Sequence, residues 1–175
     1  MKTEFKTKFL QHLIDKKQDK GFTLIELLVV IIIIGILSSI ALPSFIGQAN
    51  KAKQSEAKAY IGSMNRAQHG YYLEKAKFVT AISDVSKLGL GFETKTDNYT
   101  YGIAGSSNTT AVTNFGDGGE DKSLQSYLGG VVAIASDATA LTILCESDSP
   151  NQANVETATA TTGKNVTCPE SYSKI

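Results

Sequence analysis

An apolar stretch near the N-terminus constrains the fold of this chain more than any other feature. Every side chain from Leu27 to Ile34 is apolar, and the apolar character continues to Leu42 with only Gly35 and two serines between. As an α-helix rising about 1.5 Å per residue, residues 22–42 would extend roughly 30 Å, the thickness of the hydrocarbon core of a bilayer. The sequence therefore predicts a helix that spans a membrane.

A single carboxylate, Glu26, lies near the start of this stretch. A charged side chain inside a bilayer costs free energy and is usually retained where a partner or a function requires it. Two interpretations are open. Glu26 lies within one helical turn of the interface and is solvated by lipid headgroups, or it has a specific partner.

The flanking residues favour a specific partner. A basic leader, the sequence Lys-Gly-Phe-Thr-Leu-Ile-Glu at residues 20–26 and the apolar stretch together resemble the processing signal of type IV prepilins and of the related type II secretion pseudopilins. The resemblance implies that a membrane peptidase cuts after Gly21 and that the new amino terminus, Phe22, is N-methylated. It also implies that Glu26, the fifth mature residue, acts in assembly.

An ordinary signal-peptidase site is the alternative way to process the chain. Ser39-Ile40-Ala41 has the required small residues, and a cut there would release a protein that begins at Leu42. The apolar stretch is longer than the usual core of about 7 to 15 residues, and it contains Glu26. Both observations count against this alternative.

The charge of the leader sets the expected orientation. Residues 1–21 carry six lysines against three acidic residues, a net charge of +3, which favours retention on the cytoplasmic side. Removing the leader leaves 11 basic against 14 acidic residues, a net charge of −3. A mature chain of this composition is a poor general binder of nucleic acid, because such binding neutralises phosphates with Lys and Arg.

Helical periodicity continues past the apolar stretch and predicts one spine helix over residues 22–72. Its apolar stripe comprises Phe45, Ala49, Ala52, Ala57, Tyr60, Ile61, Met64, Ala67 and Tyr71. Gly35 lowers helix propensity, and Pro43 removes an amide donor and clashes with the carbonyl of Ser39, so a kink is expected between Gly35 and Pro43. The resemblance adds that this segment bends and partly melts in assembled filaments.

Residues 73–175 are predicted to form a globular head. A short helical turn over residues 82–88 should end at Gly89. Strand-like runs follow at Tyr99, Tyr101 and Ile103, at Val131, Val132 and Ile134, and at Leu141, Ile143 and Leu144. They predict three or four antiparallel strands and an α+β fold, with the long helix packed on a small sheet. The polar, glycine-rich stretch from Gly105 to Gly130 is expected to be mostly exposed loop, with one short strand near Val112.

The two cysteines, Cys145 and Cys168, follow the membrane span and so face the oxidising side in the predicted topology. A disulfide is therefore expected. The polar, threonine-rich segment between them lacks a core of its own and would be held by that bond. Type IV pilins have a comparable cysteine-bounded C-terminal region that many pseudopilins lack, so the resemblance favours a pilin.

Residues suited to catalysis are scarce. His12 belongs to the leader, and His69 lies on the spine, where a packing or surface role is expected; no zinc, redox or phosphate-binding motif occurs. Asp117, Glu120 and Asp121 offer oxygen ligands for calcium, but their spacing is not that of an EF-hand and a solvated turn is favoured. No cofactor is expected. Asn-x-Thr glycosylation patterns begin at Asn98, Asn108 and Asn165.

These observations predict a structural, non-enzymatic subunit of a type IV pilus. Its partners would be copies of itself, a prepilin peptidase and methyltransferase, and a pilus assembly platform. It would be a single-pass inner-membrane precursor and then part of an extracellular fibre that serves processes such as twitching motility, adhesion or DNA uptake. Glu26 would neutralise the amino terminus of Phe22 on a neighbouring subunit. The alternatives are a type II secretion pseudopilin and a secreted or membrane-anchored binding domain.

Overall fold

The computed structural model describes residues 21–91, 93–107, 110–119, 123–134, 136–137, 139–150, 159–161 and 165–175. Apart from Gly21, the predicted leader lies outside these residues. The chain divides into two units, Met1–Ile46 and Gly47–Ile175.

One helix of 52 residues, α2 (Leu24–Lys75), confirms the predicted long helix. In the first unit its apolar side chains are exposed, and this part is long and apolar enough to cross a membrane. The helix continues through Gly35 and Pro43. Because Pro43 has no amide proton, the carbonyl of Ser39 lacks its helical donor. A kink at this point stays a prediction.

The helix ends where the backbone turns left-handed at Ala76. Its φ is +53°, uncommon for a residue with a side chain, while its amide still donates to Tyr72 O over 2.8 Å. Further along, the 3-10 helix η2 (Ile82–Leu88) is followed by Gly89 with a φ of +66°. Glycine adopts this conformation freely, and the predicted short turn ending at Gly89 is confirmed.

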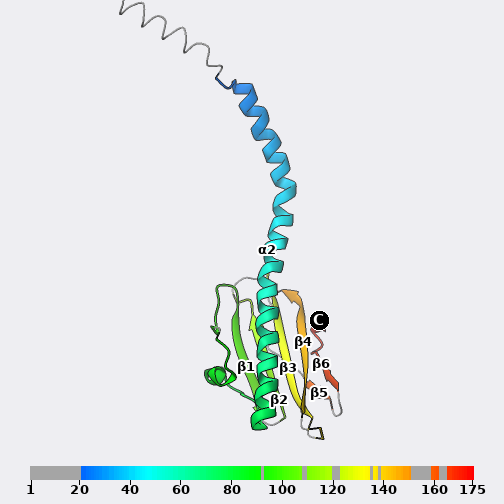
Figure 1. Ribbon diagram of the computed structural model, residues 1–175. Coiled ribbons are helices and arrows are strands. Elements are labelled where there is room, and N and C mark those ends of the chain that lie inside the picture. Colours follow the sequence, from blue (N-terminus) through cyan, green and yellow to red (C-terminus); the bar gives the residue numbers. More distant parts are fainter. Residues whose placement is uncertain are drawn as a thin grey trace, which may run out of the picture. The chain divides into compact units, whose positions relative to one another are not determined.

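An antiparallel sheet of five strands forms the second unit together with the end of α2 (Figure 1). In spatial order the strands are β1 (Thr100–Ser107), β2 (Ala111–Asp117), β3 (Gln125–Ile134), β4 (Thr139–Pro150) and β7 (Tyr172–Lys174). A separate two-stranded sheet pairs β5 (Thr159–Thr161) with β6 (Asn165–Thr167). The fold class, a long N-terminal helix on a small antiparallel sheet, is as predicted.

The expectation of a mostly exposed loop between Gly105 and Gly130 is wrong, although the short strand expected near Val112 is present as β2. This stretch contains all of β2 and the first half of β3, and most of their described side chains are buried. The polar and small residues that suggested a loop allow α2 to approach the sheet closely. A Cβ atom at Gly129 would collide with the Asn65 amide group and with Ile61 Cγ2. A larger residue there would hold helix and strand apart.

The sheet buries apolar residues on both of its faces. The larger cluster joins α2 to the sheet through Ala57, Ile61, Met64, Phe78, Val79, Tyr99, Tyr101, Ile103, Val112, Leu124, Tyr127, Val131 and Ala140. A smaller cluster consists of Leu128, Ile143, Cys145 and Tyr172, with Phe115, Val166 and Cys168 packed against it. The antiparallel pairing places Phe115, Leu128 and Cys145 in one row across β2, β3 and β4.

The predicted apolar stripe on the helix is buried only in its second part. Ala57, Ile61 and Met64 are fully buried, whereas Phe45, which belongs to the first unit, is exposed. The buried face of α2 also carries two polar residues that the periodicity did not predict, Asn65 and Gln68. Each amide hydrogen-bonds to the backbone of the head, so their burial is compensated.

Candidate processing and assembly site

The residues predicted for processing precede the first turn of α2. Gly21, Phe22 and Thr23 are not helical, and the Phe22 side chain is 85% exposed. Apart from its neighbours in the chain, no described residue has an atom within 4 Å of a Cβ atom placed on Gly21. The Gly21–Phe22 peptide bond is therefore exposed and lies outside the helix.

Thr23 and Glu26 form a reciprocal cap at the start of this helix. Thr23 Oγ1 accepts a hydrogen bond from the Glu26 amide (3.2 Å), while Glu26 Oε2 accepts from the Thr23 amide (2.9 Å) and from the Thr23 hydroxyl (2.8 Å). This is a capping box, in which the N-cap residue and the third helical residue satisfy each other's amides. The cap explains why α2 begins at Leu24 rather than at Phe22.

The sequence contained the signal for this cap. A Ser or Thr followed three residues later by a carboxylate, just before an apolar run, marks a helix start. Thr23, a partner for Glu26 within its own chain, was not predicted from the sequence. The structure thus gives the carboxylate a local role that is independent of any second subunit.

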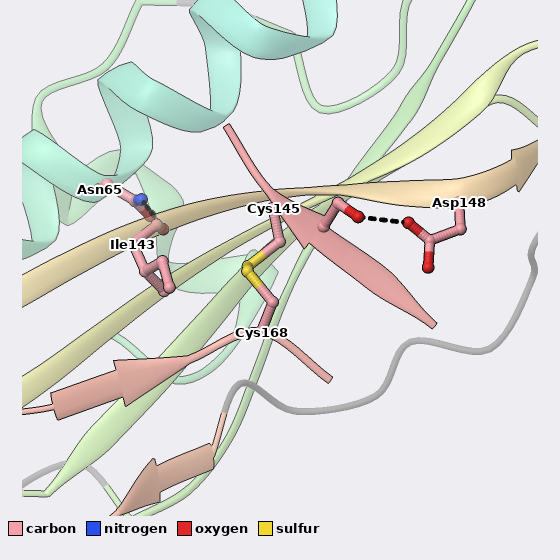
Figure 2. The surroundings of a disulfide bond; sticks show 6 residues. Asn65, Ile143, Cys145, Asp148 and Cys168 are labelled. Carbon is pink, nitrogen blue, oxygen red and sulfur yellow. Dashed lines mark hydrogen bonds between the residues drawn. A yellow bond between two sulfur atoms is a disulfide. The ribbon is translucent and has the colours of Figure 1, made fainter. Parts of the chain in front are cut away.

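The disulfide between Cys145 and Cys168 is confirmed, with the two Cα atoms 5.9 Å apart. Cys145 is fully buried on β4, and the bond links it to the residue that follows β6 (Figure 2). The bridge spans a sequence separation of 23 residues. In the chain-entropy model a loop of this size contributes about 3 kcal/mol.

The chain after Cys168 is held on the sheet by contacts of its own. β7 pairs with β4, and Tyr172 is buried in the smaller cluster. The Ser173 hydroxyl donates to Asp148 Oδ1 over 2.6 Å (Figure 2). The Asp148 amide donates to Ser171 O over 3.0 Å. This strand was not predicted from the sequence, from which the disulfide alone was expected to hold the tail.

A charged cluster next to Cys145 joins the helix to two strands. Lys58 Nζ on α2 lies 3.0 Å from Glu146 Oε2 on β4 and 5.4 Å from the ring centroid of Tyr127 on β3. The Tyr127 hydroxyl donates to Glu146 Oε1 over 3.1 Å. Burial, followed by the negative charge of Glu146, raises the pKa of Tyr127.

A second carboxylate on α2, Glu56, holds the segment that leads into β1. Its Oε1 accepts from the Thr96 hydroxyl (2.6 Å) and its Oε2 from the Asn98 side-chain amide (2.9 Å). Burial, followed by the charge of Glu56, raises the pKa of the nearby Tyr101. The Tyr101 ring stacks on that of Tyr60, with centroids 4.7 Å apart. Asn98, where the first glycosylation pattern begins, thus already donates its side-chain amide to Glu56.

The remaining predicted residues do not come together as a site. His69 Nε2 lies 3.5 Å from the Thr139 hydroxyl at the start of β4. Asp117 Oδ1 accepts from the Gly119 amide (3.2 Å), while Glu120 and Asp121 lie outside the described residues. Among the residues that the structure does describe, no three His, Cys, Asp or Glu side chains gather in a way that could hold a metal ion.

Two known sequence families match this chain. Residues 54–169 match the family described as "Type IV pilin-like G and H", which covers the end of α2 and most of the head. Residues 16–42 match the "Prokaryotic N-terminal methylation motif", which includes the capping box. No solved structure is significantly similar to the chain.

Several curated proteins share part of the sequence. The type IV major pilin protein PilA of Myxococcus xanthus is 36% identical over 101 residues, which is 57% of this chain and 44% of PilA. The type II secretion system core protein G of Aeromonas hydrophila is 37% identical over 73 residues, 42% of this chain and 51% of that protein. The type IV wide pilus major component PilA4 of Thermus thermophilus is 31% identical over 88 residues, 50% of this chain and 66% of PilA4. The chain thus spans between 44% and 66% of the length of these relatives.

Proposed function

Because this chain belongs to the type IV pilin-like family, we propose that it is the structural subunit of a type IV pilus. One observation carries the proposal: a methylation motif over residues 16–42 and a pilin-like head over residues 54–169 occur in the same chain. Filament-forming pilins are among its relatives, and the structure supplies the two parts that such a subunit needs. These are an exposed apolar helix for a membrane or a helical bundle, and a folded head.

Processing would release the mature subunit from its leader. A prepilin peptidase would cut the bond between Gly21 and Phe22, and N-methylation of Phe22 would follow. The match to the methylation motif supports both steps. The exposed, non-helical backbone at this bond supports the cut, because a protease must bind its substrate in an extended form. The lysine-rich leader would keep this end on the cytoplasmic side of the inner membrane.

Assembly would then move the apolar part of α2 from the bilayer into a bundle of identical helices. In such a bundle the free amine of Phe22 would be a positive charge in apolar surroundings. Glu26 of a neighbouring copy would neutralise it, and this pairing is stronger in a medium of low dielectric constant than in water. The fibre would extend from the cell surface and serve motility, adhesion or DNA uptake.

A pseudopilin of a type II secretion system is the second candidate. The similarity to core protein G of Aeromonas hydrophila favours it. The disulfide-bounded C-terminal region favours the pilus. Immunogold electron microscopy of intact cells separates the two, since a pilus subunit labels long surface fibres and a pseudopilin does not.

Analysis of the mature amino terminus tests the proposal most directly. Mass spectrometry should find a chain that begins at Phe22, carries one added methyl group and lacks two hydrogens because of the disulfide. Gly21→Val should leave the precursor uncut, because a bulky side chain would obstruct the cleavage site. A chain that begins at Leu42 would instead show ordinary secretion and contradict the proposed function.

Replacing the carboxylate tests the assembly step. Glu26→Leu should insert in the membrane and be cut normally, because the charge that disfavours burial is gone and Gly21 is intact. Fibres should be absent, since a neighbouring Phe22 amine would remain unpaired. Normal fibre yield from this variant would show that Glu26 is only an interface residue and would favour a membrane-anchored domain.

A further inference from the structure

One side chain of α2 contacts three neighbouring strands of the head. The Asn65 amide occupies the space that a side chain at Gly129 of β3 would take, and Asn65 is only 5% exposed. Asn65 Nδ2 donates to Ile143 O on β4 over 3.0 Å (Figure 2), and Asn65 Oδ1 accepts from Asn114 Nδ2 on β2 over 2.9 Å. From one position above β3, Asn65 thus binds the strands on both sides of it.

These hydrogen bonds do not satisfy every polar atom that the contact buries. Asn114 is fully buried, and among the residues that the structure describes no group donates a hydrogen bond to Asn114 Oδ1. A buried acceptor without a donor costs free energy, whereas replacing both partners of a buried pair by apolar groups of the same shape is nearly neutral or stabilising. Stability alone therefore does not account for this pair of asparagines.

The apolar contacts between α2 and the sheet are compatible with more than one position of the helix. Its fully buried apolar residues, Ala57, Ile61 and Met64, follow one another at intervals of four and three residues. One helical turn is about 3.6 residues. A slide of one turn would thus bring Met64 or Ala57 over Gly129, where Ile61 now lies. Glycine has no side chain that would block the slide.

We infer that Asn65 and Asn114 fix the register of α2 on the sheet. After a slide in one direction, Asn114 would face Ile61, which offers no hydrogen-bond acceptor in its side chain. After a slide in the other direction it would face Gln68, whose amide would have to leave the backbone of Val79. Only the observed register pairs all of these amides, in the way that a single buried asparagine fixes the register of a coiled coil.

The register has a consequence for assembly, and this consequence rests on the proposed pilus function. A slide of one turn would move the head about 5.4 Å along α2. Copies that carry their heads at different positions on this helix would not repeat identically along a fibre. The two asparagines would therefore serve regular assembly, at a cost in the stability of the single subunit.

A double substitution tests the inference. Asn65→Leu together with Asn114→Leu removes both amides and supplies apolar side chains of similar volume. Asn50→Leu is the matched control, because it makes the same chemical change on the same helix. It removes the hydrogen bond from Asn50 to Ser123, which lies apart from the pair.

The register is measured by NMR on the mature full chain in detergent micelles. The original protein and Asn50→Leu should show a nuclear Overhauser contact between the Ile61 methyl groups and the α protons of Gly129. In the double variant this contact should weaken, and contacts from Met64 or Ala57 to Gly129 that the original protein lacks should appear. The denaturant midpoint of the double variant should be equal to that of the original protein or higher.

Three results would overturn the inference. A double variant that keeps the Ile61 contact at full strength and gains no other would show that apolar packing fixes the register. A double variant that does not fold would show that the pair is needed for stability. New contacts in Asn50→Leu as well would show that any such change on α2 loosens the register.

Electron microscopy of cells tests the consequence for assembly separately. The double variant should be processed normally, and its fibres should be scarce or lack regular helical order. Regular fibres from a variant whose register has slipped would show that assembly does not depend on the register, while the proposed function would stand. Absence of fibres from the original protein would contradict the proposed function and leave the NMR result on the register intact.

Discussion

Gln68 on α2 binds the backbone of Val79 as a neighbouring strand would. Gln68 Oε1 accepts from the Val79 amide over 3.0 Å, and Gln68 Nε2 donates to the Val79 carbonyl over 2.6 Å. The Gln68 side chain is fully buried and Val79 is nearly so. These two hydrogen bonds hold the segment that follows α2 against the helix.

Replacing Gln68 by leucine should therefore destabilise the head. The variant would leave a buried amide and a buried carbonyl of Val79 unsatisfied, at about 1–3 kcal/mol for each group. The free energy of unfolding by denaturant, measured in detergent micelles, should fall accordingly. Gln48→Leu makes the same chemical change at an exposed position of α2 and should have little effect. Equal stability of the two variants would show that the Val79 groups find other partners.

Loss of the disulfide should loosen part of the tail and leave β7 in place. We expect Cys145→Ala with Cys168→Ala to lower the free energy of unfolding by about 3 kcal/mol, the loop-entropy contribution. Limited proteolysis should produce new cuts between Pro150 and Cys168. Because β7 keeps its pairing with β4 and the bond from Ser173 to Asp148, residues after 169 should stay protected. Early cleavage within β7 would show that the disulfide alone holds it.

Stability should fall at alkaline pH because of Tyr127. Burial beside Glu146 raises the pKa of its hydroxyl above that of the unfolded chain, which is about 10. Below that pH the contribution to stability is complete. As the pH rises further, the unfolded state loses its proton first and folding becomes less favourable. The slope of unfolding free energy against pH above about 10 should be smaller in Tyr127→Phe than in the unsubstituted protein.

Glycine should be favoured over alanine at the end of α2. A left-handed backbone costs a residue with a side chain roughly 1–2 kcal/mol, and Ala76 has a φ of +53°. Ala76→Gly should therefore raise the free energy of unfolding by about 0.5–1 kcal/mol, since glycine also loses more entropy on folding. Ala59→Gly, at an exposed position inside the helix, should lower it by about 1 kcal/mol. A loss of stability in both variants would contradict the strain at Ala76.

The elements that follow from the sequence are those with long, regular patterns. The apolar stretch and the stripe through Ala57 and Ile61 predicted the helix, because each pattern repeats over many turns. β2 was predicted only as a short strand near Val112, because Thr113, Asn114 and Gly116 have the composition of a loop. Two of the three are buried polar residues, and they form a strand because the helix and the neighbouring strands cover them.

The candidate site shows the same limit at a smaller scale. Gly21, Phe22 and Glu26 were predicted from their pattern, and the match to the methylation motif spans all three. Their roles stay predictions. The bonds between Thr23 and Glu26 had a sequence signal, a threonine followed three residues later by a carboxylate. It was not used, because the family resemblance already gave Glu26 another role. β7 had no sequence signal, because three residues are too few for a periodic pattern. Its stability comes from the partner strand and from burial of Tyr172.

Four consecutive residues of β4 each connect a different part of the head. Cys145 forms the disulfide with the tail, and Glu146 forms an ion pair with α2. Ser147 accepts a hydrogen bond from the Ser126 amide of β3, and Asp148 accepts one from β7. Inserting a single residue here would break all four connections at once, because alternate side chains of a strand face opposite sides of the sheet. An epitope tag or a fluorophore is therefore better placed between Pro150 and Thr159, where extra chain leaves the register of the five-stranded sheet intact.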